Sequence, residues 1–192
     1  MTEFPDTYLQ CGRFRLTIDG PGFRPLVMGV LNLTPDSFSD GGRFASLDAA
    51  ITQAEHMIES GVDIIDIGGE STRPGSDPVS VDEELRRVMP AIFALRDCGK
   101  PLSIDTRRPE VMREAVAAGI DMVNDISGFR AEGGLSLLRD SDCALCIMHM
   151  QGEPQTMQQD PHYSDVVAEV SDFLAAQAQA ALDAGISLSQ LC

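Results

Sequence analysis

The sequence predicts an α/β fold in which helices cover a parallel sheet, and two observations lead to this prediction. Strand-like apolar runs alternate with helical patterns at a spacing of roughly thirty-odd residues, which is the size of a βαβ unit. These runs are apolar almost throughout, which is typical of strands buried on both faces. With 192 residues, the chain is long enough for one sizeable core and short for two ordinary domains.

Five strand-like runs are expected after a short extended N-terminal piece at residues 13–19. They lie at residues 26–31, 62–67, 101–104, 121–126 and 144–150. Amphipathic helical patterns fill the intervals between them. The first of these helices is expected at residues 48–61 and the last at about residues 164–185.

The two middle helices have readable ends. Ser80 and Glu83 form a capping-box pattern that opens a helix whose apolar face continues to Leu95. Pro109 suits the first turn of the next helix and Gly119 its end, because proline is tolerated at helix starts and glycine at C-caps.

Two α/β architectures are compatible with this alternation, an open doubly wound sheet and a (β/α)8 barrel. A dinucleotide-binding sheet would need G-x-G-x-x-G after the first strand, and that motif is absent. The stretch at residues 69–76 resembles a phosphate-binding loop faintly, but it lacks the lysine. The residues therefore support neither nucleotide motif.

Charge and composition restrict the partners. The chain has 14 Lys and Arg against 30 Asp and Glu, a net charge of −16, so we expect neither a nucleic-acid partner nor an anionic membrane partner. No apolar run reaches about 18 residues, and the start lacks a signal-peptide pattern, so the cytoplasm is the expected location. The five cysteines are scattered; Cys143 and Cys146 spell CxxC, but they would face opposite sides of a strand, and reduced thiols are expected.

Polar residues gather near the carboxyl ends of the expected strands. If the apolar residues Leu31, Ile65, Ile67, Ile104 and Ile147 face the helices, strand alternation directs four others into one central space, namely Asn32, Asp105, Asn124 and Met148. Parallel α/β folds place ligands at this end. Each of the polar residues could instead cap a loop or a helix, but four side chains that converge on one space favour a binding site.

The residue types indicate the ligand. A carboxylate and an amide beside Met and Ile suit a flat heterocycle with ring N–H donors and a carbonyl group. Thr72 and Arg73, in a glycine-flanked loop, suit phosphate or carboxylate. The oxygen of Asn32 suits a hard cation such as Mg²⁺, which often uses one or two protein oxygens together with substrate phosphates.

Several segments resemble the dihydropteroate synthase family, which belongs to the pterin-binding proteins. MGVLNLTPDSFSDGG at residues 28–42 is similar to the family's first signature, and DIGGESTRPG at residues 66–75 is similar to its second. SIDT at 103–106, VNDIS at 123–127 and MHMQG at 148–152 match further family segments in the same order. The resemblance extends from about residue 26 to the last residue.

The resemblance implies a (β/α)8 barrel that joins p-aminobenzoate to 6-hydroxymethyl-7,8-dihydropterin diphosphate and releases diphosphate in folate synthesis. Asn32 would ligate Mg²⁺ on the diphosphate. The catalytic residues would be Asp105, Asp40 and Arg73, the two carboxylates stabilising positive charge on the pterin in the transition state. The substrate-binding residues would be Thr72, Asp105, Asn124, Ile126, Met148, Phe38 and Pro74, the last two beside the aromatic amine.

The sequence departs from the family in its extent. We count about five βα units where the barrel has eight, so we expect one pterin-binding barrel domain at residues 1–192, truncated before the sixth strand. The family's second pterin carboxylate, its lysine, its later basic residues and its dimer helices would be missing, so a homodimer is doubtful. Two alternatives stay open, a methyltetrahydrofolate-dependent methyltransferase and a non-catalytic pterin-binding fragment.

Overall fold

The fold is built on one parallel sheet with helices packed against it. The computed structural model describes residues 7–20, 23–34, 42–71 and 78–192. The sheet has five strands in the order β3-β4-β5-β6-β7. They are β3 (Met28–Asn32), β4 (Ile64–Gly68), β5 (Leu102–Asp105), β6 (Met122–Asp125) and β7 (Ala144–Ile147).

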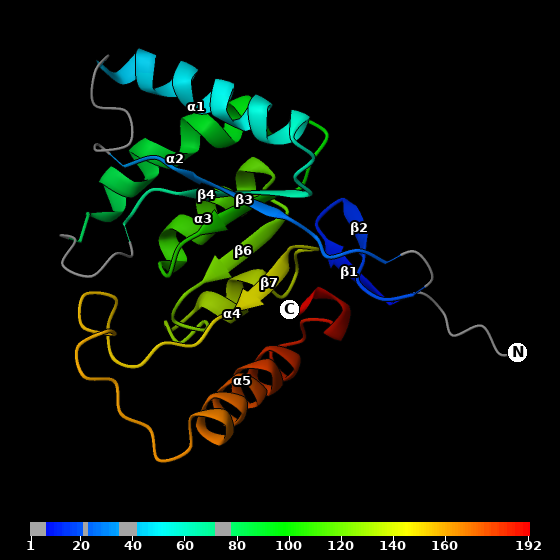
Figure 1. The fold of residues 1–192 in the computed structure, drawn as a ribbon, viewed down its shortest axis with the longest axis vertical. Coiled ribbons are helices and arrows are strands. Elements are labelled where there is room, and N and C mark those ends of the chain that lie inside the picture. Colours follow the sequence, from blue (N-terminus) through cyan, green and yellow to red (C-terminus); the bar gives the residue numbers. More distant parts are fainter. Residues whose placement is uncertain (1–6, 21–22, 35–41, 72–77) are drawn as a thin grey trace, which may run out of the picture.

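The strand order distinguishes the two expected architectures. Each strand pairs in parallel with the next one along the chain. A doubly wound sheet reverses its order at a switch point, whereas a barrel adds strands in one direction and keeps its helices outside. The α/β prediction is thereby confirmed, and the arrangement is that of part of a (β/α)8 barrel (Figure 1).

In the described part of the chain, four α-helices connect successive strands of the sheet and a fifth follows β7. They are α1 (Gly42–Glu59), α2 (Val81–Leu95), α3 (Pro109–Ala118), α4 (Gly134–Leu138) and α5 (Val166–Asp183). The short α4 had no sequence prediction, because its five residues begin at a pair of glycines and carry too little periodicity. Helix α1 begins before the predicted residue 48, so the first helix prediction was wrong at its start.

The predicted ends of the middle helices are largely confirmed. Ser80 caps α2 by accepting a hydrogen bond from the backbone N–H of Glu83, but the Glu83 carboxylate pairs with Arg86 and Arg87 instead of completing the box. Pro109 begins α3, and Gly119 closes it with φ of 94°, in the left-handed region that glycine tolerates.

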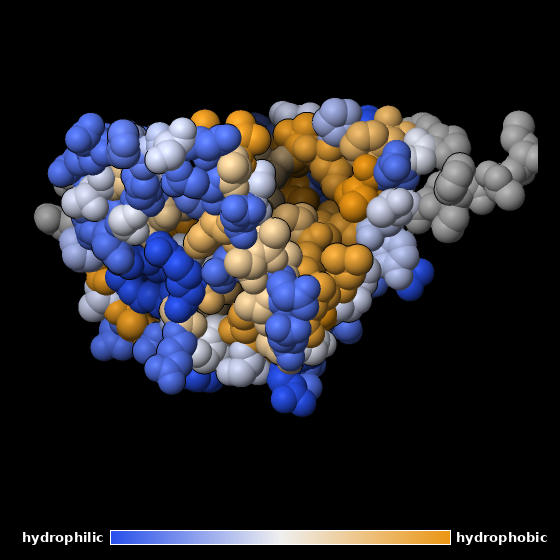
Figure 2. Space-filling model, turned by 90° about the horizontal axis from the view of Figure 1, so that it is seen from below, coloured by the Kyte–Doolittle hydropathy of each residue, from blue (hydrophilic) through white to orange (hydrophobic). Residues whose placement is uncertain are grey.

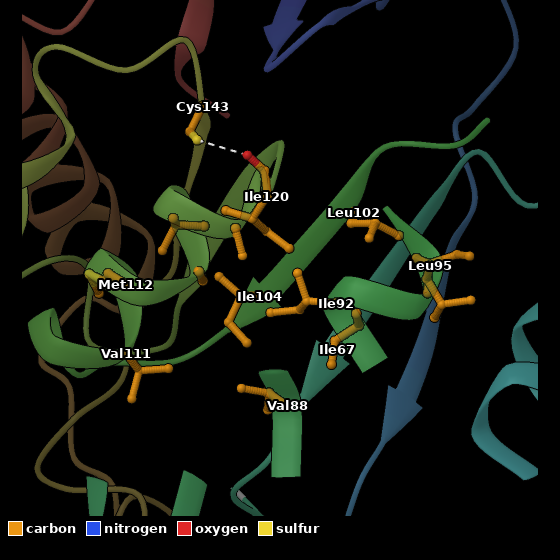
Figure 3. Close-up of a cluster of buried hydrophobic side chains, with 14 of the residues drawn as sticks. Ile67, Val88, Ile92, Leu95, Leu102, Ile104, Val111, Met112, Ile120 and Cys143 are labelled. Carbon is orange, nitrogen blue, oxygen red and sulfur yellow. Dashed lines mark hydrogen bonds between the residues drawn. The ribbon is translucent and has the colours of Figure 1, made fainter. Parts of the chain in front are cut away.

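The main core lies between the outer face of the sheet and the helices. Alternate strand residues point outward, so Ile67 and Ile104 meet Val88 and Ile92 of α2, and Met112 of α3 continues the layer (Figure 3). All five of these side chains have no exposed surface. The predicted outward direction of the apolar strand residues is confirmed, and the alternate residues must therefore face the inside.

A hairpin closes the amino end of the inner face. The predicted extended piece is two antiparallel strands, β1 (Tyr8–Cys11) and β2 (Phe14–Thr17), of which only the second was expected. Leu9 and Cys11 are buried against the first residues of three sheet strands, Ile64, Met122 and Ala144. The hairpin lies beside the amino ends of the strands (Figure 1), so the carboxyl ends form the end available to a ligand.

The last two residues lie beside the outermost strand, β7. Leu191 forms a parallel bridge with Leu145. The Cys192 N–H donates to the carbonyl of Leu145 at 3.0 Å, and Ile147 donates to Cys192 at 2.9 Å. The chain thus enters the position where a sixth barrel strand would lie.

Replacing Gly12 with alanine should detach the hairpin. Gly12 has φ of +56°, and a Cβ there would lie 2.4 Å from Oδ1 and 2.7 Å from Cα of Asp121. We expect Gly12→Ala to lower the free energy of unfolding by about 3 kcal/mol in urea denaturation, because a buried backbone must move. The control is Gly61→Ala, which has φ of +91° with nothing within 4 Å and should cost only about 1 kcal/mol. Equal losses would contradict the packing argument.

Candidate active site

One row of residues crosses the sheet near the carboxyl ends of the strands. Asn32 pairs with Gly68, Gly68 with Asp105, Asp105 with Asn124, and Asn124 with Cys146. Because paired residues of neighbouring strands point to the same face, these side chains share the inner face. The structure thus brings together Asn32, Asp105 and Asn124, as strand alternation predicted.

Gly68 lets the side chains on either side of it approach one another. A Cβ at this position would lie 3.4 Å from Oδ1 of Asn32 and 3.8 Å from Oδ2 of Asp105. Both oxygens therefore border the same small space above a bare backbone. A hard cation or a ligand with N–H donors fits between such oxygens better than an anion does.

Asp105 sits in an unusually acidic environment. Burial raises the pKa of its carboxyl group to about 7, and the nearby carboxylates of Asp66, Glu84, Asp125 and Glu70 contribute in that order. A positive charge or an N–H donor that enters the site would therefore stabilise the ionised form of this carboxyl group. This is the behaviour expected of a group whose charge matters during a reaction.

A pocket opens beside Asp105. It is lined by Glu70, Ser71, Asp105, Thr106, Arg107, Ile126, Pro154 and Gln155. Ile126 is only 8% exposed, so it forms a well-packed apolar side of the pocket. The lining therefore combines two carboxylates, a guanidinium group and an aliphatic surface, and these groups suit a flat polar heterocycle.

Two arginines after β5 hold the neighbouring loops. Arg108 pairs with Glu70 at 3.0 Å and with the buried Glu84. Arg107 pairs with Glu153 at 2.9 Å. Sequence reasoning missed both arginines, although a Thr-Arg-Arg run directly after a strand end was a signal that could have marked them.

Met148 and His149 follow β7 and have different surroundings. Met148 is 37% exposed and follows the strand whose Cys146 belongs to the row. The His149 ring lies 4.9 Å from the Phe173 ring and 5.9 Å from the Tyr163 ring, in tilted or edge-on contacts. His149 thus packs against α5 and against the segment that precedes this helix, away from the inner face.

The remaining predicted site residues lie outside the described part of the chain. They are Phe38, Asp40, Thr72, Arg73 and Pro74. Their roles therefore stay predictions.

Two further classes of site have no support within residues 7–20, 23–34, 42–71 and 78–192. No group of three or more His, Cys, Asp or Glu side chains is placed to hold a metal ion. Cys143, of the CxxC pair, is buried and donates to the carbonyl of Ile120 at 3.1 Å, and burial raises the pKa of its thiol to about 11.

In the same described stretches, no helix has both the length and the apolar character needed to cross a membrane.

Comparison with known proteins identifies the family. The family described as pterin binding enzyme matches this chain over residues 28–192. This chain belongs to the pterin-binding enzyme family. The match includes every strand of the parallel sheet and all five helices.

Individual members of the pterin-binding enzyme family are closely similar in sequence. The dihydropteroate synthase of Neisseria meningitidis serogroup B is 47% identical over 181 residues, which cover 93% of this chain and 62% of that protein. The enzyme of Synechocystis sp. is 50% identical over 172 residues, covering 88% of this chain and 60% of its own length. The chain thus spans about three fifths of these relatives.

Solved structures of this pterin-binding enzyme family agree with the fold. Burkholderia cenocepacia dihydropteroate synthase, complexed with 7,8-dihydropteroate, has a TM-score of 0.84 at 54% identity and covers 98% of this chain and 63% of its own. The Xanthomonas albilineans enzyme with 4-aminobenzoic acid has a TM-score of 0.86 at 48% identity, with 97% and 65% covered. The barrel-like arrangement of sheet and helices is therefore that of the family.

Proposed function

We propose that this chain carries the pterin-binding side of a dihydropteroate synthase. That enzyme joins p-aminobenzoate to 6-hydroxymethyl-7,8-dihydropterin diphosphate and releases diphosphate. The observation that carries the proposal is the row in which Asp105 and Asn124 are paired neighbours and Asn32 lies across Gly68. The relatives support the reaction, because two of their structures hold its product and its amine substrate.

The proposed reaction replaces one bond at the pterin methylene carbon with another. The carbon–oxygen bond to diphosphate breaks with its electron pair, and the amine nitrogen of p-aminobenzoate forms a bond to the carbon and then loses a proton. Positive charge develops on the pterin as the diphosphate leaves. The Asp105 carboxylate, in its acidic environment, stabilises that charge most in the transition state.

Other residues bind and orient the substrates in this proposal. Asn124 and Asp105 hold the polar edge of the pterin, while Ile126 and Met148 pack on its ring. Asp40 joins Asp105 in stabilising the cation. The remaining substrate contacts are assigned to Thr72 and Arg73 for the diphosphate and to Phe38 and Pro74 for p-aminobenzoate.

Magnesium is proposed as the cofactor, and the residues present fit it. The exposed Asn32 amide has its oxygen at the tip of β3, beside the space above Gly68. One protein oxygen is enough for Mg²⁺ when substrate phosphates and water complete its shell. When bound, the ion would neutralise the leaving diphosphate. The location implied is the cytoplasm, where thiols such as the free Cys11 and Cys98 stay reduced.

A binding titration tests the proposal directly. We expect the purified chain to bind 6-hydroxymethyl-7,8-dihydropterin, followed by its fluorescence, and Asn124→Leu to weaken that binding about tenfold. The matched control is Asp63→Asn, which removes a carboxylate at the amino end of β4, where it pairs with Arg24. Equal binding by wild type and Asn124→Leu would contradict the assignment.

A further inference from the structure

Asp66 is a buried carboxylate that the proposed reaction does not use. It lies in the middle of β4, pairs with Ser103 of β5 in the sheet, and is 3% exposed. By strand alternation it faces inward with Gly68, one layer below the row that contains Asp105 and Asn124. Burial raises the pKa of Asp66, while hydrogen bonds from the side chains of Ser103 and Asn124 lower it.

A hydrogen bond connects Asp66 to the row above it. The Nδ2 group of Asn124 donates to Oδ2 of Asp66 at 3.2 Å, reaching from β6 past β5 to β4. The Oδ1 atom of Asn124 is buried and has no hydrogen-bond partner within the described part of the chain. The donor end of the amide is therefore in use, while its acceptor end remains available.

The partner of an asparagine decides which way its amide is oriented. The oxygen and nitrogen ends have nearly the same shape, so packing alone does not distinguish the two orientations. A carboxylate offers only acceptors when ionised, so it attracts the NH2 group and repels the oxygen. Asp66 thus supplies the preference that packing lacks.

We propose that Asp66 is a positioning residue that orients the Asn124 amide so that its oxygen faces the ligand. The inference rests on the proposed pterin site and deepens it by stating the hydrogen-bonding pattern the site accepts. A ligand edge with neighbouring N–H donors meets the Asn124 oxygen and the Asp105 carboxylate. A heterocycle with acceptors at that edge meets two oxygens and is rejected.

The sequence offers a clean experiment, because asparagine occurs only at positions 32 and 124. Selective nitrogen-isotope labelling of asparagine therefore gives two side-chain NH2 signals in an NMR spectrum. Asn32 is exposed and serves as an internal reference, while Asn124 is 9% exposed. In the wild-type chain we expect the Asn124 NH2 protons to exchange with water at least about tenfold more slowly than those of Asn32.

Two variants separate the role of Asp66 from simple burial. Asp66→Leu removes the acceptor at similar volume, and the Asn124 NH2 signals should exchange about tenfold faster or split into two orientations. Met122→Leu changes a buried side chain of the same layer at similar volume and removes no hydrogen-bonding group, so it should leave those signals unchanged. If Asp66→Leu does not fold, Asp66→Ala replaces it, and faster exchange or two orientations are again expected because the acceptor is missing.

A ligand titration completes the test. Asp66→Leu should bind 6-hydroxymethyl-7,8-dihydropterin about tenfold more weakly than Met122→Leu does. Asn124 signals that exchange as fast as those of Asn32 in wild type, or that are unchanged in the Asp66 variant, would overturn the positioning role. Pterin binding by none of the proteins, with the expected NMR differences, would instead reject the proposed function and leave the positioning role standing.

Discussion

The 192-residue chain, purified by itself, should form no measurable dihydropteroate from both substrates and Mg²⁺. The parallel sheet formed by the described residues has five strands, whereas a closed barrel of this class has eight. The inner face is consequently open on one side, and Val30, which lies on it, is 53% exposed. Figure 2 shows apolar side chains gathered around a hollow in the molecule. Water therefore reaches the space where the reaction would take place, which weakens every charge interaction in it.

The charge of the diphosphate adds to the expected loss of turnover. The chain has a net charge of −16, and the nearby Arg107 and Arg108 are already paired with carboxylates. A leaving group of high negative charge therefore finds little compensation except from Mg²⁺ and, as proposed, Arg73. As the family resemblance implies, basic residues in the part of the relatives that lies beyond this match would have to supply the rest.

The measurement is a product assay on the monodisperse chain. The chain is assayed alone and again after addition of the carboxyl-terminal two fifths of a relative such as the Neisseria meningitidis enzyme. We expect activity only in the second case. Folding of the chain alone is checked by circular dichroism and urea denaturation, so that aggregation is recognised. Turnover by the chain alone would show that the described inner face is sufficient for the chemistry.

Replacing Asp105 with asparagine should stabilise the fold while it impairs the reaction. Because the pKa of Asp105 is raised to about 7 in the folded chain, the folded state holds a proton that the unfolded chain has released between about pH 4 and pH 7. The free energy of unfolding therefore falls as pH rises through this window. Asp105→Asn should raise it by about 2 kcal/mol at pH 8 and far less at pH 4. Urea denaturation at both pH values measures this difference.

The catalytic effect of the same change should have the opposite sign. In a protein completed with the carboxyl-terminal part of a relative, we expect Asp105→Asn to lower kcat about 100-fold, because the charge matters most where the cation develops. Pterin affinity should fall only about tenfold, as for one lost charged hydrogen bond. Equal losses in kcat and affinity would mean that Asp105 only anchors the ring. Asp63→Asn, at the other end of the barrel, is the control for both measurements.

The strand faces, the helix starts and the family could be predicted from the sequence because their signals are local. Strand alternation placed Asn32, Asp105 and Asn124 on one face, and the structure has them in one row. Ser80 and Pro109 marked helix starts, since the orphan N–H groups of a first turn depend only on nearby residues. The signature segments added the family, which the comparison with known proteins confirms.

The tertiary structure decided what depends on which strands are neighbours. Periodicity alone left the barrel and the doubly wound sheet open, the family resemblance implied the barrel, and the pairing order of the strands shows which of the two the chain adopts. The hydrogen bond from Asn124 to Asp66 joins residues 58 positions apart across an intervening strand, so no local sequence pattern predicts it. The raised pKa of Asp105 likewise arises from burial and from carboxylates on other segments. The sequence by itself placed Asn32, Asp105 and Asn124 on one face of the sheet. Long-range packing decided the pKa of Asp105, the orientation of the Asn124 amide and which other residues, such as Arg107, line the pocket. The reason is that desolvation and hydrogen bonding depend on neighbours that only the folded chain brings together.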